Sequence, residues 1–514
     1  MLKRFFLFAL AILLLGSQPL RAQARHFSLQ DVSLKTVDYK LDLDIDFKDG
    51  KIAGDCQLTV SNPGPQPVEK IPLILYRLMK VTAAKDGHGA NLTFRQQVLA
   101  FEDWDKLQVN FIEVSLKSPI RKGERRTVEI LYDGYLCGYS EAMQYVKDHV
   151  DIDFTIIRTD SIAYPEVGVP SWKANRATGL QAFDYMIKVK VPESLAVANG
   201  GKLAAKSERD GFVTYVYQNL RPAWRIDAAI AKYDLLEDIP NSLRVFHFQK
   251  DKDGARAVLQ ALRDAFELYK RWFGPLDGTP EYSLIEVPEG YGSQADVTSI
   301  LLTRDSFLSK DNLTDLYHEI AHRWDVTARD PLPSRFESEG RAMFLQYLVQ
   351  EKLENKKGAL EEGVERACRS FRKQCQPGSK GKDVPMIDYG KEDLTDLSYS
   401  KGMVFFYLLY KLAGEKELLD TLGSFHRKYG PTGATTEDFL IHLKQNLKID
   451  LTKLLQDWVY GATSSDYLIN KIPIDQIVKK YLQTGGRSPI CIVARILLGI
   501  GCLVYWRWTT TYFG

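Results

Sequence analysis

The sequence predicts an α+β, multidomain protein with a β-rich N-terminal part and a mostly helical part after it. Apolar and polar residues alternate one by one over 41–47, which is typical of a strand with one buried face. From Asp253 onwards the apolar residues recur every three to four positions, as they do on one face of a helix. With 514 residues, the chain is long enough for roughly two to four domains.

The first residues are typical of a secretory signal peptide. Lys3 and Arg4 precede an apolar run over 5–15, and Ala22-Gln23-Ala24 provides a small-residue cleavage site. We expect cleavage of residues 1–24, or their retention as an anchor, and export to a periplasmic or other extracytoplasmic location. The six cysteines are too few for a disulfide scaffold, and a net charge of +2 gives no reason to expect a nucleic-acid partner.

Residues 25–250 are predicted to form a β-rich domain. Asp49-Gly50 separates two alternating runs, which indicates a hairpin between 41–47 and 52–60. Further strands are expected over 126–132, 185–191, 212–218 and 243–248.

Residues 251–470 are predicted to form a second domain, in which two short strands precede a series of helices. The first helix should end near Gly274, and the strands follow at 282–287 and 299–303. Ser309 or Asp311 is expected to cap the helix that carries residues 318–322. The later helices are expected at 339–354, 360–372, 398–412, 417–429, 436–446 and 451–460.

Two histidines four residues apart, His318 and His322, are the strongest functional signal. On a helix this spacing puts both imidazoles on one face, where they can bind one metal ion. Glu319 lies beside the first histidine and can act as general base toward a metal-held water. This H-E-x-x-H pattern predicts a catalytic zinc site with one Zn²⁺ per chain; a chance helix face is the alternative.

A catalytic zinc needs a third protein ligand. Glu337 and Glu339 are both candidates. We favour Glu339, because it begins a predicted helix and the small residues Gly340 and Ala342 would let that helix pack closely against the first one. Asp325 would either orient an imidazole or be an ordinary surface residue.

Three motifs in this order resemble the aminopeptidase N and leukotriene hydrolase family of gluzincin zinc metallopeptidases. They are Trp324 two residues after the H-E-x-x-H pentamer, Glu339-Gly340-Arg341-Ala342 and Tyr399-Ser400-Lys401-Gly402. The resemblance implies a saddle-like, all-β N-terminal domain followed by a thermolysin-like, mostly helical catalytic domain. It also implies that Glu339 is the third ligand and that Tyr399 is a catalytic donor to the oxyanion. Sixteen residues separate His322 from Glu339, two fewer than is usual, which we interpret as a shortened loop.

A substrate-binding loop is matched only in part. The family carries Gly-x-Met-Glu-Asn along an edge strand that binds the peptide, and this chain has Gly292-Ser293-Gln294-Ala295-Asp296. The resemblance implies that Gly292, Gln294 and Ala295 contact substrate. Ala295 replaces the glutamate that grips the free amine, although Gln294 can supply a neutral hydrogen bond. We therefore expect an aminopeptidase-like zinc metallopeptidase that cleaves peptides at or near their N-termini, with a weakened requirement for a free amine.

Residues 471–514 are expected to contain a linker and a C-terminal membrane helix over 490–506. These seventeen mostly apolar residues, interrupted by Arg495, are near the lower length limit for crossing a bilayer. A buried or interfacial helix is the alternative. The alternative function is an exported, membrane-tethered binding protein with a vestigial site, but the complete ligand set together with Glu319 argues against it.

Overall fold

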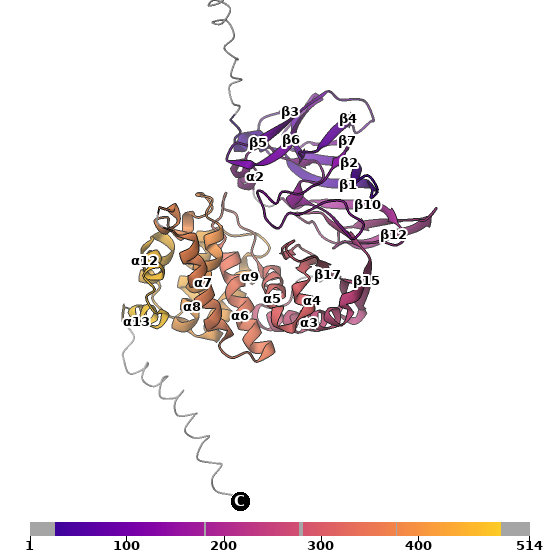
Figure 1. Ribbon diagram of the computed structural model, residues 1–514. Helices are drawn as coiled ribbons and strands as arrows, with labels where there is room; N and C mark the ends of the chain where they lie inside the picture. Colours follow the sequence, from indigo (N-terminus) through magenta and orange to yellow (C-terminus); the bar gives the residue numbers. More distant parts are fainter. Residues whose placement is uncertain (1–25, 179–180, 277–280, 377, 485–514) are drawn as a thin grey trace, which may run out of the picture.

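Two units, one β-rich and one mostly helical, form the molecule in the computed structural model (Figure 1). The structure describes residues 26–178, 181–276, 281–376 and 378–484. The β-rich unit contains the N-terminal part of the chain, and the helical unit contains the rest. This order confirms the predicted fold class.

A seven-stranded sheet is the main element of the N-terminal unit, with the order β12-β13-β10-β1-β2-β7-β4. Its strands are β1 Lys35–Asp46, β2 Lys51–Ser61, β4 Met79–Asp86, β7 Arg125–Tyr135, β10 Asp184–Pro192, β12 Lys202–Arg209 and β13 Phe212–Gln218. The predicted hairpin is present, because Asp46 pairs with Lys51 across its turn. Leu41, Leu43 and Ile45 are buried on one face of β1, as the alternation predicted.

Two smaller sheets complete this unit, a four-stranded one with the order β5-β6-β3-β9 and a three-stranded one with the order β11-β14-β8. Their strands are β3 Val68–Tyr76, β5 Phe94–Phe101, β6 Trp104–Ile120, β8 Phe154–Arg158, β9 Glu166–Val167, β11 Ala196–Ala198 and β14 Asp227–Ala231. The short helix α2, Trp172–Ala177, lies on the side that faces the helical unit (Figure 1).

A five-stranded sheet with the order β15-β16-β17-β19-β18 belongs to the second unit. Its strands are β15 Tyr233–Asp238, β16 Leu243–Phe248, β17 Tyr282–Val287, β18 Gln294–Ala295 and β19 Ser299–Thr303. Because β16 pairs in parallel with β17, the segment 233–248 packs with the second unit. The segment 233–248 thus shares a sheet with strands that follow the predicted boundary at residue 250. A pairing between strands so far apart in the sequence cannot be seen in the local alternation of apolar and polar residues.

The predicted helices lie close to their predicted ranges, whereas α4, α12 and α13 were not predicted. The helices of this unit are α3 Lys252–Phe273, α4 Asp305–Leu308, α5 Thr314–Ala321, α6 Arg341–Glu354, α7 Ala359–Gln374, α8 Asp396–Ala413, α9 Glu415–Tyr429, α10 Thr436–Asn446, α11 Thr452–Leu455, α12 Thr463–Ile469 and α13 Ile474–Thr484. Neither predicted cap begins α5, because Ser309 caps a 3₁₀ turn over Lys310–Asn312 and α5 starts after it. The helix expected to start at Glu339 begins instead with a π-helical turn, Phe336–Gly340.

Helix α13 packs onto the helical unit, although it lies after residue 470, the predicted end of the second domain. Ile477 and Tyr481 are buried in its core, and the indole N–H of Trp458 donates to the Tyr481 hydroxyl at 3.0 Å. Among the described residues, no helix combines the length and the apolar character needed to cross a membrane. The predicted signal peptide, 1–24, and the predicted membrane helix, 490–506, lie outside the described residues.

Candidate metal centre

Three side chains predicted as metal ligands converge between α5 and the π turn. Glu339 Oε2 lies 3.3 Å from His318 Nε2 and 3.4 Å from His322 Nε2. Donor atoms of the three residues all fall within 4.8 Å of one another. Four ligands arranged as a tetrahedron around zinc, at about 2.0–2.1 Å each, would be about 3.3–3.4 Å apart. The residues present therefore fit a zinc ion.

A polar partner holds the outer nitrogen of each imidazole. His318 Nδ1 donates to Gln346 Oε1, and His322 Nδ1 donates to Asp325 Oδ2, both at 2.8 Å. With Nδ1 protonated, Nε2 presents its lone pair toward the centre, as a metal ligand must. Asp325 is thus an orienting residue and not an ordinary surface aspartate. Sequence reasoning missed Gln346, although it lies seven residues after Glu339 and so on the same side of its helix.

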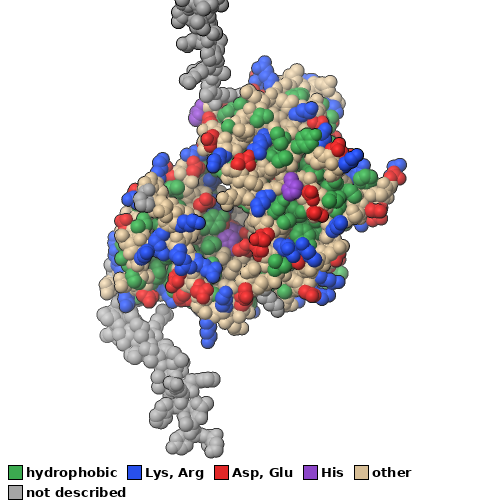
Figure 2. Space-filling model, viewed as in Figure 1, with side chains coloured by type: hydrophobic (Ala, Val, Ile, Leu, Met, Phe, Trp, Pro, Cys, Tyr) green, Lys and Arg blue, Asp and Glu red, His purple; other side chains and the backbone are tan. Residues whose placement is uncertain are grey.

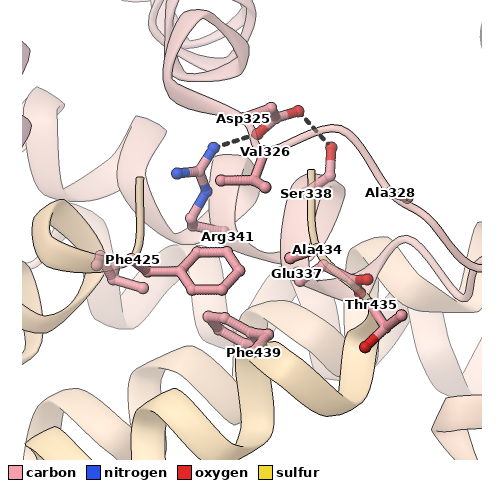
Figure 3. Close-up of a pocket in the computed structure, with 11 residues that line it drawn as sticks. Asp325, Val326, Ala328, Glu337, Ser338, Arg341, Phe425, Ala434, Thr435 and Phe439 are labelled. Atoms are coloured by element: carbon pink, nitrogen blue, oxygen red, sulfur yellow. Dashed lines mark hydrogen bonds and ion pairs between the residues drawn. The ribbon is translucent and has the colours of Figure 1, made fainter. Parts of the chain in front are cut away.

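Asp325 is itself fixed by two further bonds, which Figure 3 shows together. Ser338 Oγ donates to its Oδ2 at 2.6 Å, and Arg341 forms an ion pair with its Oδ1. These residues line a cavity of about 20 Å³ behind the histidines, which has room for about one water molecule. Both bonds fix the Asp325 carboxylate. Because that carboxylate accepts from His322 Nδ1, the orientation of the His322 ring is fixed as well.

The two candidate glutamates point in different directions. Glu337 Oε1 accepts a hydrogen bond from Thr436 Oγ1 at 2.8 Å, on the side of α10. The two carboxylate oxygens of Glu339 have different partners. Oε2 faces the histidines, and Oε1 accepts a hydrogen bond from Arg335. Burial raises the pKa of the Glu339 carboxyl, but Arg335 and His322 outweigh it and hold that pKa well below its usual range. The geometry therefore places Glu339, and not Glu337, beside the imidazoles.

Glu319 and Tyr399 bring an acid–base group and a hydroxyl to the same centre. Glu319 is only 8% exposed, and burial raises the pKa of its carboxyl. The ring of Tyr399, on α8, lies parallel to that of His318, with the two centroids 6.1 Å apart. Burial, and then the charge of Glu339, raise the pKa of Tyr399 far above neutrality, so its hydroxyl stays protonated and can donate.

The predicted substrate loop forms the free edge of the five-stranded sheet. Gln294 and Ala295 constitute β18, which pairs only with β19. Position 292 requires a glycine, because its φ is +75° and an added Cβ would lie 3.2 Å from Tyr145. The backbone of β18 is thus presented along an open sheet edge, where an extended peptide can pair with it.

The side chain of Gln294 is already engaged with the N-terminal unit. Its Oε1 accepts from Arg225 at 2.8 Å and from Arg158 at 3.3 Å, and its Nε2 donates to Asp160 Oδ1 at 3.2 Å. Burial raises the pKa of the Asp160 carboxyl, but Arg225 and Arg158 outweigh it and lower that pKa to about 2. Sequence reasoning found no such network, because its members come from three segments far apart in the chain.

The centre lies in a hollow between the two units. Figure 2 shows this hollow below the β-rich unit, with a histidine side chain visible inside it. Around the centre, the histidine helix α5 contacts the edge strand β18, and Tyr399 at the start of α8 lies beside His318. A substrate that enters the hollow can therefore meet all three.

Comparison with known proteins agrees with this arrangement. Residues 296–458 match the model of the peptidase family M1 domain. The chain is 20% identical over 330 residues to aminopeptidase M1-A and 18% identical over 294 residues to aminopeptidase M1-B, both from Oryza sativa subsp. japonica. These matches cover 59% and 53% of this chain but only 37% and 34% of those proteins, so the chain spans little more than a third of their length.

Solved structures show the same fold. The M1 zinc metallopeptidase from Deinococcus radiodurans superposes with a TM-score of 0.59 at 17% identity, over 86% of this chain and 97% of that one. A mutant of that protein bound to a Tyr-Ser-Ala substrate gives the same values. Residues 296–458 thus resemble a peptidase family M1 domain, and the chain has the fold of the two-domain M1 zinc metallopeptidases.

Proposed function

We propose that this protein is a zinc-dependent, aminopeptidase-like peptidase that hydrolyses peptide bonds at or near peptide N-termini. The observation that carries the proposal is the spacing of His318, His322 and Glu339, which suits one zinc ion. Bound there, zinc would supply a Lewis acid that polarises a carbonyl and acidifies a water molecule. Glu319 and Tyr399 are proposed to supply the remaining chemistry.

Glu319 is proposed as the general base. Its carboxylate takes a proton from the attacking water and passes that proton to the leaving amine. Burial raises its pKa, which makes it a better proton acceptor than an exposed glutamate. Tyr399 is proposed to donate its O–H to the oxygen that becomes negative as the carbonyl carbon is attacked.

The edge strand β18 is proposed to bind the peptide backbone through Gly292, Gln294 and Ala295. Ala295 provides no carboxylate for the free amine. Asp160 is ionised and lies 3.2 Å from the Gln294 amide, but Arg225 and Arg158 already neutralise it. We therefore infer a weak hold on the amine, which a comparison of free and acetylated peptides would measure; more than about a thousandfold preference for free amines would contradict it.

The alternative, a binding protein with a vestigial site, predicts that zinc or hydrolysis is absent. The test measures zinc content and peptide hydrolysis on the same preparations. Wild type should hold one zinc per chain and cleave. Glu319→Gln should keep zinc while its rate falls by about 10²–10⁴-fold, as expected for loss of a general base.

A matched pair of variants tests the ligand assignment. Glu339→Ala should lose zinc, whereas Glu337→Ala should keep it, because Glu337 bonds to Thr436 on the far side. The opposite result would transfer the ligand role to Glu337. Zinc-loaded wild type that cleaves no peptide would favour the vestigial alternative.

A further inference from the structure

Arg341 joins the start of α6 to the end of the histidine helix. It lies two residues after the third of the predicted ligands, and it is only 5% exposed. Its Nη1 donates to the Trp324 carbonyl at 3.0 Å, and its Nη2 donates to the Ala321 carbonyl at 3.3 Å and forms an ion pair with Asp325. One guanidinium therefore has three acceptors, and each of them lies within three residues of His322.

The two carbonyls belong to the place where the histidine helix ends. Asp325, directly after Trp324, has an extended backbone with a φ of −67° and a ψ of 151°, so the helix does not continue. The last carbonyls of a helix need hydrogen-bond donors from elsewhere, and they carry a partial negative charge that a cation stabilises. Arg341 supplies both the donors and the charge, and it thereby fixes the end of the helix that carries two of the three predicted ligands.

The same guanidinium acts on His322 through the Asp325 carboxylate. Figure 3 shows Arg341 and Ser338 bonded to different oxygens of this carboxylate. Its Oδ2 also accepts from His322 Nδ1 at 2.8 Å. Because Arg341 lies only two residues after Glu339, the contacts that fix the His322 ring also connect it to the segment that carries Glu339.

We propose that Arg341 is a positioning residue of the metal centre, which holds His322 and Glu339 in their relative positions. The proposal rests on the function proposed above, since it concerns the same zinc site. The planar fork of an arginine can serve several acceptors at once, whereas the ammonium of a lysine is a single point of charge. Residues that orient the ligands of a metal typically change its affinity by about 10–100-fold when they are removed.

The test replaces Arg341 by methionine, which is unbranched but uncharged, and by lysine, which keeps only the charge. Zinc affinity is measured by competition with a chelator. Co²⁺ replaces zinc in a second set of samples, because its visible spectrum reports the geometry of its ligands. Arg341→Met should weaken zinc binding by about 10–100-fold and change the cobalt spectrum. Arg341→Lys should lie between this variant and wild type, because one ammonium cannot reach all three acceptors in the same geometry.

Arg244→Met and Arg244→Lys are the matched controls. Arg244 is another buried arginine of the second unit, and it donates to the Gly201 carbonyl at 2.9 Å and to Ser283 Oγ at 2.8 Å. Its variants should keep the zinc affinity and the cobalt spectrum of wild type. Urea unfolding of the metal-free proteins measures the loss of stability in both sets of variants, so that a general effect of removing a buried arginine is separated from an effect on the metal centre.

Wild-type zinc affinity and a wild-type cobalt spectrum in Arg341→Met would overturn the proposal, and so would an equal change in Arg244→Met. If Arg341→Met does not fold, the lysine variants decide: wild-type values in Arg341→Lys would overturn the proposal, because the guanidinium fork would then be dispensable. Failure of the peptidase function would look different, because wild type would then bind zinc and cobalt but hydrolyse no peptide.

Discussion

The burial of Tyr399 and the nearby Glu339 carboxylate determine the protonation state of the Tyr399 hydroxyl. Burial, and then the Glu339 carboxylate, raise the pKa of Tyr399 well above neutrality, so its hydroxyl is protonated at neutral pH and can donate. Its ring lies parallel to that of His318, which places it beside the centre. Such a donor acts most strongly when negative charge develops on the substrate oxygen.

Tyr399→Phe should therefore lower kcat by about 10²–10³-fold and change KM little, because the lost bond forms mainly in the transition state. Steady-state kinetics on zinc-loaded protein would measure both constants. Tyr410→Phe, on the same helix but bonded to Glu415 away from the centre, is the control and should retain full activity. A rate that is unchanged in Tyr399→Phe would remove this residue from the mechanism.

Single residues could be predicted from the sequence where chemistry and local spacing suffice. His318, Glu319 and His322 lie within four residues of one another, about one helical turn, so their proximity follows from helix geometry alone. Gln346 and Asp160 also bond to residues of the site, but their partners are set by tertiary contacts. Arg335 lies four residues before Glu339, a spacing that allows a local ion pair, and sequence reasoning missed it.

At the scale of elements, the centre depends on a close contact between the π turn and α8. A Cβ added to Gly340 would lie 2.6 Å from Gly402 Cα and 3.0 Å from the Ser398 carbonyl oxygen. Backbones can approach this closely only where both side chains are hydrogen atoms. The contact fixes Glu339 and Tyr399 relative to each other, because each lies within three residues of one of the two glycines.

Gly340→Ala should accordingly lower the free energy of unfolding by about 1–3 kcal/mol, the usual effect of overpacking. It should also reduce kcat, because α8 and Tyr399 must move away. Denaturant unfolding and kinetics would measure the two effects. Gly87→Ala, where an added Cβ would meet only ordinary contacts at 3.5 Å or more, should change stability by less than about 0.5 kcal/mol. Normal stability and rate in Gly340→Ala would show that the glycine contact is dispensable.

Elements were predictable from periodicity, but their assignment to units was not. Strands β13, β16, β17 and β19 have the predicted bounds. The pairing of β16 with β17 crosses the predicted boundary at residue 250, and it could not be predicted because β17 begins more than thirty residues after β16 ends. The start of α5 and the π turn were also missed, since both depend on how the loop around the zinc helix closes.

At the scale of the whole molecule, buried charges join the two units beside the edge strand. Arg158 is fully buried in the N-terminal unit, yet it donates to the Tyr291 carbonyl of the second unit at 3.2 Å. Arg225 bonds to Asp160, Asp227 and Gln294 and so connects both units as well. The strand proposed to bind substrate is thus held by contacts from both units, which gives the N-terminal unit a direct part in shaping the site.

Buried carboxyl groups also make the stability of the whole molecule depend on pH. Glu286, on β17, is 0% exposed, and its Oε2 accepts from the Phe248 N–H at 2.7 Å. Burial raises the pKa of Glu286, the hydrogen bond from the Phe248 N–H lowers it, and the neighbouring Asp251 raises it further. The net result is a pKa of about 8. In the unfolded chain this carboxyl should titrate near its ordinary pKa of about 4.3. The folded protein therefore binds one more proton than the unfolded chain between these two values.

It follows that the contribution of Glu286 to stability is fully present below about pH 4.3, falls as pH rises toward 8, and is constant above that. Glu286→Gln keeps the shape but removes the titration. The stability of wild type relative to Glu286→Gln should therefore decrease between pH 5 and pH 8.5, by on the order of 3 kcal/mol. Urea unfolding at both pH values would measure this difference, and the exposed Glu289→Gln should show no such decrease. A wild-type-to-variant difference that is the same at both pH values would mean that Glu286 ionises in the folded protein as readily as in the unfolded chain.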